Sequence, residues 1–289
     1  MSEQKVSLLA IQTGDYLLKF NGRTLVMGIL NVTPDSFSDG GMFLEKDKAV
    51  ARGIALANEG ADIIDVGGES TRPGADPVSL QEELDRVIPV ISELTDSIDV
   101  PISVDTYKSD VAREAISAGA SMINDISGLR FDKEMANFAA EKEVAVVLMH
   151  IKGSPRNMQL DPQYDNMLEE IKNYLSESIE IGIKAGIDKS KIIVDPGIGF
   201  GKKIEDNFEL IKNLGYFREL GHPILVGPSR KSFLWKTLSR APSDTLEATT
   251  AAVTASILYG ADIVRVHDVK EISGAIKIAD LISNSPELN

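Results

Sequence analysis

The sequence predicts a single-domain α/β protein folded as a (β/α)8 TIM barrel, and three observations lead to that fold class. Short runs rich in β-branched residues alternate with helical patterns along the chain, which favours a parallel sheet covered by helices. Eight such pairs follow one another without a break in composition, and eight strands close a barrel. The length of 289 residues suits one barrel, so an open doubly wound sheet is the weaker alternative.

The strands are predicted from a repeated pattern in which a helical stretch ends at a glycine and a short apolar run follows. Residues 58–68, 117–128 and 258–268 show it most clearly. A glycine just past a helix fits a left-handed cap, and the apolar run fits a parallel strand buried on both faces. The eight predicted strands are Leu25–Leu30, Asp62–Val66, Ile102–Asp105, Met122–Asp125, Ala145–Met149, Ile192–Asp195, Ile224–Gly227 and Ile263–Val266.

Helical patterns fill the intervals between these strands. They are Asp47–Glu59, Leu80–Thr95, Ser109–Ala118, Lys133–Glu141, Asn166–Ala185, Glu205–Tyr216, Thr245–Leu258 and Ile272–Ser283. Residues 1–24 precede the first unit, and we expect this N-terminal extension to close the bottom of the barrel as a small hairpin. The barrel itself is expected to span residues 25–289.

Charge and composition exclude several classes of function. The net charge of −14 disfavours general nucleic-acid binding, which calls for clustered Lys and Arg. The absence of cysteine excludes disulfides, thiolate metal sites and thiol catalysis. The apolar runs are short and the first residues lack the pattern of a signal peptide, so we expect a cytoplasmic protein without membrane contact.

Polar residues follow nearly every predicted strand, where the active sites of barrels lie. Any one of them fits helix capping, and we interpret Asp65 and Asp125 as structural caps. As a set they predict one polar pocket. The strand ends carry Asn31, Asp65, Asp105, Asn124, Asp125, His150, Asp195, Ser229, Arg230, Lys231, Arg265 and His267.

Two segments are interpreted as loops that close this pocket. Residues 30–43 are rich in turn formers yet carry Phe37 and Phe43, which favours a lid over a merely solvated loop. In residues 67–75, Arg72 stands before Pro73, so an extended backbone presents a guanidinium suited to an anion. The alternatives are a packed loop with buried aromatics and a surface arginine.

The last two strand ends carry glycines and cations. Residues 195–202, DPGIGFGK, lack the spacing of a nucleotide phosphate loop, so their glycines are expected to let the backbone approach a flat ligand. Phe200 in this segment is placed to stack on a ring. An anionic substrate of a −14 chain requires a local positive cluster, and the expected members are Arg230, Lys231, Arg265 and His267.

Asp105, Asn124 and Asp195 come from three strands and are expected to converge. Two carboxylates and an amide can bind a ligand edge that offers N–H donors, such as a guanidine-like group. The same three side chains can equally form a Mg²⁺ site. Residue chemistry leaves both alternatives open.

At this point the chain resembles the dihydropteroate synthase family. The matching motifs run in order from about residue 25 to residue 270: GILNVTPDSFSDGG, DVGGESTRPGA, SVDTYK, INDISG, LMH, DPGIGFGK, GPSRKSF and RVHDV. The resemblance implies a transferase of a pterin-methyl group. It joins 6-hydroxymethyl-7,8-dihydropterin diphosphate to p-aminobenzoate with Mg²⁺ as cofactor, and diphosphate leaves before the amine attacks.

The resemblance also implies a role for each position that matches. The catalytic residues would be Asp105, Lys231 and Asp39. The pterin would be bound by Asp105, Asn124, Met149, Asp195, Phe200, Gly227 and Lys231. Diphosphate would be bound by Asn31, Arg72, Arg265 and His267, with Asn31 as the Mg²⁺ contact. p-Aminobenzoate would meet Phe37, Thr71, Pro73 and Ser229.

The resemblance further implies sulfonamide inhibitors and a homodimer, for which residues 248–258 and 272–281 offer apolar stretches. Pro228 departs from the family, which usually has a small residue there, and it should stiffen the turn before Ser229. Three rival functions remain. They are a pterin-binding corrinoid methyltransferase, a Schiff-base aldolase that uses Lys231, and a non-catalytic pterin-binding barrel.

Overall fold

The computed structural model describes residues 10–33 and 42–286, with only the backbone for residues 42–45. Its main sheet is a ring of parallel strands in the order β8-β7-β6-β5-β4-β3-β10-β9. A bridge from Val194 to Ile224, just before β9, closes the ring, so the predicted barrel is confirmed. The strands are β3 Leu25–Asn31, β4 Ile63–Gly67, β5 Ile102–Asp105, β6 Met122–Asp125, β7 Ala145–Met149, β8 Ile192–Asp195, β9 Leu225–Val226 and β10 Ile263–Val266.

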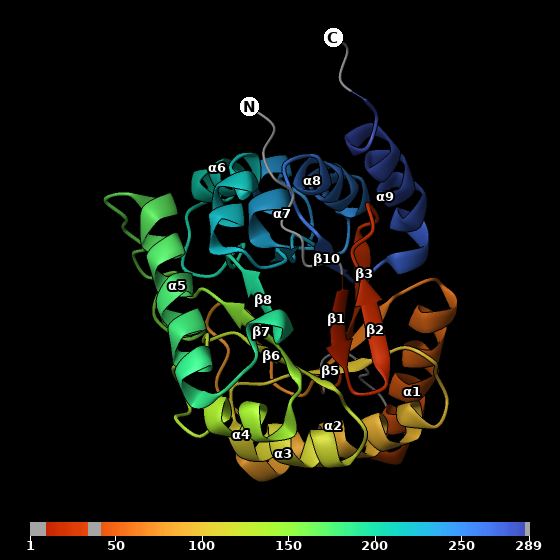
Figure 1. Ribbon diagram of the computed structural model, residues 1–289. Helices are drawn as coiled ribbons and strands as arrows, with labels where there is room; N and C mark the ends of the chain where they lie inside the picture. The colour runs from red at the N-terminus through yellow and green to blue at the C-terminus, as the bar shows by residue number, and fades with distance from the viewer. Residues whose placement is uncertain (1–9, 34–41, 287–289) are drawn as a thin grey trace.

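The helices surround the strands (Figure 1). They are α1 Met42–Asn58, α2 Leu80–Thr95, α3 Ser109–Ser117, α4 Met135–Lys142, α5 Met167–Ala185, α6 Ile204–Lys212, α7 Ser232–Leu238, α8 Leu246–Leu258 and α9 Val269–Ser283, with 3-10 turns η2 Lys189–Lys191 and η3 Leu214–Leu220. Within the described ranges, none of these helices has the length and apolar character needed to cross a membrane.

The seventh unit differs from its prediction in two ways. Strand β9 is shorter than the predicted Ile224–Gly227, because Pro223 and Pro228 flank it and proline has no N–H to donate to a ladder. Helix α7 follows it and was not predicted. It is only seven residues long and has no side-chain cap, so the burial of Phe233 and Leu234 is what stabilises it.

The glycines that were expected to end helices do so. Gly60, Gly119 and Gly260 have φ of 102°, 113° and 115°. This left-handed backbone is costly for residues with a Cβ, which explains glycine at these ends. Each turn releases the chain directly into β4, β6 or β10, so a local signal sets where three strands begin.

The interior of the barrel is filled from its amino-terminal end. Strands β1 (Ala10–Thr13) and β2 (Tyr16–Lys19) form an antiparallel hairpin that lies across the ring in Figure 1. Its Ile11 and Leu18 are buried against inward-facing Met27, Ile63 and other barrel residues. The Thr13 hydroxyl donates to the Ser121 carbonyl. Apolar packing therefore occupies this end of the barrel, and polar side chains gather at the other.

Candidate active site

The carboxyl ends of four strands meet in one buried ion-pair cluster. The Arg265 guanidinium, from β10, donates through Nε to Asp65 Oδ2 at 2.6 Å and through Nη2 to Asp105 Oδ2 at 2.7 Å. Asn124 Nδ2, from β6, donates to the same Asp65 oxygen at 3.0 Å. Asp65 is fully buried, and Asp105 and Asn124 are 9% and 4% exposed. The guanidinium thus joins Asp65 and Asp105, and Asp65 in turn holds Asn124.

Of the two aspartates interpreted as structural caps, only Asp125 is one. Asp65 is not a structural cap, since it anchors Arg265 and Asn124. Asp125 is the expected local cap, because its carboxylate accepts from the Ser127 N–H and hydroxyl at 2.7 Å and from the Leu129 N–H at 2.9 Å. Two aspartates that look alike in the sequence therefore have different roles.

Asp195 lies at the start of the glycine segment, residues 195–202. Its Oδ1 accepts from the Gly197 N–H at 2.7 Å, and the Phe200 N–H closes a turn onto the Gly197 carbonyl at 3.1 Å. Gly197 has φ of 73°, and a Cβ there would overlap the His150 carbonyl oxygen. Only glycine fits this close approach, so the segment holds Asp195 in one orientation.

An apolar wall stands beside these carboxylates. Phe200 and Met149 are buried in a small cluster with Ile126, Ile151 and Met158. The Lys231 ammonium lies 3.9 Å from the centroid of the Phe200 ring, a cation–π contact. This wall and the carboxylates together make a site with a flat apolar face and a polar edge.

Three charged groups of the site, Asp105, Asp195 and Lys231, have pKa values shifted toward neutral pH. Burial raises the pKa of Asp105 to about 7, although the Arg265 charge opposes the change and Asp65 adds to it. Burial raises the pKa of Asp195 to about 6, against the Gly197 N–H and the Lys231 charge. Burial lowers the pKa of Lys231 to about 8, with Arg265 reinforcing the effect and the two aspartates opposing it. Several ionisable groups with shifted pKa values in one site are typical of active sites.

Two members of the expected positive cluster, Lys231 and Arg265, lie beside the site aspartates, whereas Arg230 and His267 differ from the expectation. Arg230 is 42% exposed at its side chain and pairs with Asp268 at 2.5 Å, so its charge is already balanced. Nδ1 of His267 lies 2.9 Å from the Ser229 hydroxyl, and burial holds the pKa of His267 well below its usual range. The remaining cation, Lys231, faces both site aspartates.

The second loop is anchored by a network that the sequence reasoning missed. Glu69 accepts from the Tyr107 hydroxyl at 2.7 Å and from Lys108 Nζ at 2.6 Å. Lys108 also donates to Glu83 at 2.5 Å and to the Val78 carbonyl at 2.9 Å. Glu69 and Glu83 are buried. The signal was a charged residue within three positions of a strand end, in GGEST and again in VDTYK.

The loop that this network holds carries Thr71, Arg72 and Pro73. Thr71 is half-buried, whereas Arg72 and Pro73 are exposed. The Arg72 charge still helps to lower the pKa of both Lys231 and His267, so its guanidinium lies on the site side. Asn31 is half-buried at the end of β3. Phe37 and Asp39 lie outside the described residues, as does the side chain of Phe43.

Gly227, the remaining residue predicted to bind the pterin, lies beside Arg265. A Cβ on Gly227 would stand 3.6 Å from Cβ of Arg265, so this glycine leaves room beside the guanidinium. The structure thus brings together the seven positions predicted for pterin: Asp105, Asn124, Met149, Asp195, Phe200, Gly227 and Lys231.

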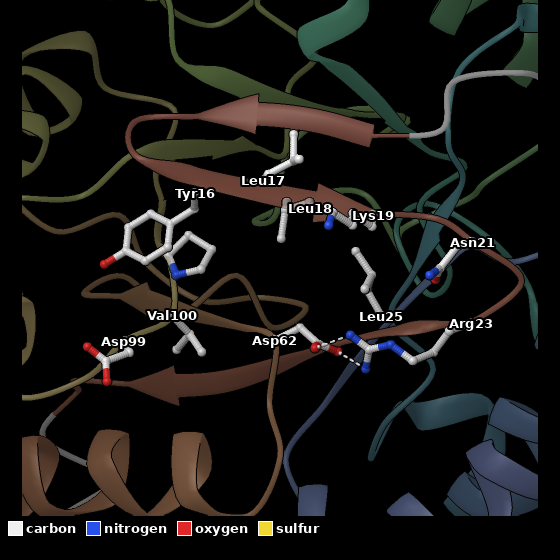
Figure 2. A pocket seen from close by; sticks show the side chains of 11 residues that line it. Tyr16, Leu17, Leu18, Lys19, Asn21, Arg23, Leu25, Asp62, Asp99 and Val100 are labelled. Carbon is white, nitrogen blue, oxygen red and sulfur yellow. Dashed lines mark hydrogen bonds and ion pairs between the residues drawn. The ribbon is translucent and has the colours of Figure 1, made fainter.

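A separate hollow of about 360 Å³ lies at the opposite end of the barrel, beside the hairpin. Figure 2 shows Tyr16, Val100 and Asp99 along one side of it and the Arg23–Asp62 ion pair on the other. That pair is 2.6 Å long. Its charges balance each other, and it lies away from the cluster of titrating groups at the carboxyl ends.

Comparison with known proteins places this architecture in one family. The family model described as "Pterin binding enzyme" matches residues 27–267. Dihydropteroate synthase of Bacillus subtilis is 49% identical over 274 residues, which cover 95% of this chain and 94% of that protein.

Solved structures agree with the sequence match. Dihydropteroate synthase of Xanthomonas albilineans, solved with 4-aminobenzoic acid, has a TM-score of 0.90 and 43% identity, and the match covers 96% of this chain and 99% of that one. The Yersinia pestis enzyme, solved with a sulfonamide drug, has a TM-score of 0.90 and 42% identity over 96% and 100% of the two chains. The chain therefore belongs to the family of pterin-binding enzymes.

Proposed function

We propose that this chain is a dihydropteroate synthase. As a transferase, it would join 6-hydroxymethyl-7,8-dihydropterin diphosphate to p-aminobenzoate and release diphosphate. The observation that carries the proposal is the convergence of Asp105, Asn124, Asp195 and Lys231 on one buried site with an aromatic wall. Relatives of that name, similar over nearly the whole chain, support it.

The pterin would bind by its polar edge and its flat face. A carboxylate is the natural acceptor for a guanidine-like edge, and the Gly197 N–H fixes the orientation of the Asp195 carboxylate. Asp105 and Asn124 would complete the polar edge from the neighbouring strands, both oriented by the buried cluster. Phe200 and Met149 supply apolar surface for the ring.

The diphosphate would lie where the cations gather. Lys231, Arg72 and Arg265 are the expected charged contacts, and His267 and Asn31 would contribute as neutral hydrogen-bonding groups. Preorganised cations stabilise the charge that develops on a leaving group. Arg265 is already oriented by Asp65 and Asp105, so no reorganisation is needed at the moment of reaction.

The reaction would begin with cleavage of the bond between the pterin methylene carbon and the diphosphate oxygen, and the electron pair leaves with diphosphate. The amine nitrogen of p-aminobenzoate then attacks the methylene cation, and its proton passes to solvent. The Asp105 carboxylate is the group that would stabilise the cation. Asp39, in the first loop, is proposed to assist.

We propose that Mg²⁺ enters with the diphosphate. Among the residues that the structure describes, no group of three or more His, Cys, Asp or Glu could hold a metal ion. The alternative of a site built from Asp105, Asn124 and Asp195 is disfavoured, because Asp105 pairs with Arg265 and the Asn124 amide donates to Asp65. Mg²⁺ often needs one or two protein oxygens beside substrate phosphates, and Asn31 would offer one. Its bound charge would help diphosphate to leave.

p-Aminobenzoate would lie between the second loop and the turn after β9. Thr71 and Pro73 would contact it from one side and Ser229 from the other, and Phe37 is proposed to close the site. The Ser229 hydroxyl accepts from the His267 N–H at 3.3 Å. We propose that sulfonamides compete for this position, as the drug complex of the Yersinia pestis relative suggests.

The proposed homodimer would use α8 and α9. Several apolar residues on or next to these helices are 43–60% exposed: Leu258, Tyr259, Ile278, Leu281 and Ile282. Exposed apolar surface of this kind favours an interface over solvent. Sedimentation of the purified protein tests it, and a monomer at all concentrations would contradict it. Location in the cytoplasm stays a prediction.

The decisive assay mixes both substrates with Mg²⁺ and measures released diphosphate and pteroate formed. We expect both from the wild-type protein and near loss of both from Asp105→Asn, since the cation would lose its carboxylate. No release by folded protein would refute the proposed synthase activity. Full turnover by Asp105→Asn would exclude the role of that residue. Borohydride trapping on Lys231 with a keto substrate would favour an aldolase, and methyl transfer to a corrinoid would favour the methyltransferase.

A further inference from the structure

Lys202 is a charged residue that the proposed chemistry does not use, and it is 2% exposed. Its ammonium makes three contacts: the Gly197 carbonyl at 2.8 Å, the Phe200 carbonyl at 3.1 Å and Nδ1 of His150 at 3.0 Å. A lysine ammonium has three N–H donors, so each donor has an acceptor. The contacts require His150 to accept at Nδ1 and carry its proton on Nε2.

His150 suits this neutral, accepting state. It is 4% exposed at the end of β7, and its ring packs edge-on against Tyr174 with centroids 4.8 Å apart. Burial holds the pKa of His150 well below its usual range, and the Lys202 charge is the next cause. The imidazole is therefore a fixed acceptor. Burial lowers the pKa of Lys202 to about 7, against the charges of Asp195 and Asp206, and the three acceptors around its nitrogen favour the ammonium form.

The ammonium bridges a turn whose backbone has little regular structure. Gly197, Gly199 and Gly201 all have positive φ, of 73°, 82° and 64°, and residues 196–203 lie outside every helix and strand. Glycines lose more conformational freedom on folding than other residues, so such a turn needs contacts that hold it. Lys202 supplies two of them from inside the turn.

Both ends of the bridged turn hold groups of the site. At one end the Gly197 N–H donates to Asp195 at 2.7 Å. At the other end Phe200 places its ring 3.9 Å from the Lys231 ammonium. A shift of either carbonyl away from Lys202 would therefore move a polar contact and an aromatic wall of the same site.

Lys202 also places a positive charge near Asp195. Burial raises the pKa of Asp195 to about 6, and the charges of Lys231, Lys202 and Arg265 oppose that rise. The charged groups that face Lys202 itself are Asp195, Asp206, Lys231 and Lys152, beside the His150 ring. A buried cation so placed favours the ionised carboxylate that a guanidine-like edge requires.

We propose that Lys202 is a positioning residue for the pterin: its buried ammonium fixes the turn from Gly197 to Phe200 and keeps Asp195 oriented and ionised. The inference rests on the proposed function and deepens it. Lys202 need not touch the substrate, because its three donors are bound within the protein. Lys202 would affect pterin binding indirectly, through the positions of Asp195 and the Phe200 ring.

The test compares Lys202→Met with Lys203→Met, a matched control on the adjacent exposed lysine. The dissociation constant of 6-hydroxymethylpterin and the KM of its diphosphate are measured. Loss of the buried ammonium should raise both by about tenfold or more, which corresponds to roughly 1.4 kcal/mol. The KM of p-aminobenzoate at saturating pterin should change by less than about threefold, and Lys203→Met should match the wild type in all three.

A pH profile separates this role from a merely structural one. Without the Lys202 charge the pKa of Asp195 rises, so the pH below which pterin binding weakens should move upward in Lys202→Met. Lys202→Arg keeps the charge and should bring the pH below which pterin binding weakens back toward that of the wild type. The proposal would be overturned if Lys202→Met had a lower unfolding temperature but the pterin affinity, and the pH dependence of pterin binding, of the wild type.

A measurement on the wild-type protein covers the case in which Lys202→Met does not fold. With isotope-labelled lysine, the side-chain NMR signal of Lys202, assigned through Lys202→Arg, should shift when 6-hydroxymethylpterin binds, and that of Lys203 should not. An unmoved Lys202 signal at saturating pterin would refute the inference. If the wild type binds no pterin, the proposed function fails and this inference with it, whereas normal wild-type binding with an unaffected variant refutes the inference alone.

Discussion

Asp65→Asn removes one charge from the centre of the buried cluster and leaves the shape of the side chain. Asp65 Oδ2 accepts from Arg265 at 2.6 Å and from Asn124 at 3.0 Å, and the residue is fully buried. After the change Arg265 keeps Asp105, at 2.7 Å. The amide that replaces the carboxylate would retain one carbonyl acceptor for the two donors.

The loss of unfolding free energy in Asp65→Asn depends on which partners Arg265 and Asn124 keep. Removing one partner of an isolated buried ion pair costs about 3–5 kcal/mol. Here Arg265 keeps a second carboxylate, so we expect a loss near one charge-assisted hydrogen bond, about 1.5–3 kcal/mol. For a chain of this size that lowers the unfolding midpoint by roughly 3–6 °C.

The same variant should change the pH dependence of catalysis. The Asp65 charge contributes to the raised pKa of Asp105, which is about 7. Without that charge the pKa of Asp105 falls, so Asp105 stays ionised to lower pH. The acid limb of kcat/KM should move downward in pH, even though the maximum rate drops because Asn124 and Arg265 lose their common anchor.

Denaturant unfolding and a pH–rate profile check both expectations, with Asp125→Asn as the control. Asp125 is equally buried but holds a local turn through Ser127 and Leu129. That variant should lose stability and leave the acid limb in place. An unfolding free energy for Asp65→Asn within about 0.5 kcal/mol of the wild type, or an acid limb that does not move, would refute the reasoning.

Three further outcomes are expected. Lys108→Met leaves two buried glutamates uncompensated and should cost about 3–5 kcal/mol of unfolding free energy; under about 1 kcal/mol would contradict the anchoring network. Gly197→Ala should abolish pterin binding because its Cβ meets a backbone carbonyl. Gly60→Ala has open space around it but keeps a positive φ, so it should cost about 1–2 kcal/mol of unfolding free energy and leave pterin affinity unchanged; equal losses of pterin affinity would contradict this. The folded-state pKa of Asp105 is raised from 3.8 to about 7, so the folded state binds the extra proton and stability falls as pH rises through that window. Asp105→Asn should flatten that fall in pH-dependent unfolding and be the more stable protein above pH 7, and an unchanged slope would exclude Asp105 as its cause.

Much of the barrel could be predicted from local sequence. Strands β5, β6, β7, β8 and β10 begin and end at the predicted residues, because each is a short apolar run that ends at or next to a polar residue. The helix-ending glycines need a left-handed backbone that is a property of the residue itself. Where the local signal is weak, as in α7 or the two-residue β9, prediction failed or overran, since packing decided the outcome.

Periodicity and turn chemistry act within a few residues, so the amino-acid sequence was enough to predict the ring of strands and the polar set at their ends. How that set divides depends on tertiary contacts. Asp65 and Asp125 are the same residue type at similar strand ends, yet Asp65 meets Arg265 across 200 residues of chain and Asp125 meets its own turn. Lys202 ends a glycine motif, and its burial beside His150 depends on a neighbouring strand. Partners distant in the sequence leave no periodic signal, so only the closed barrel pairs them.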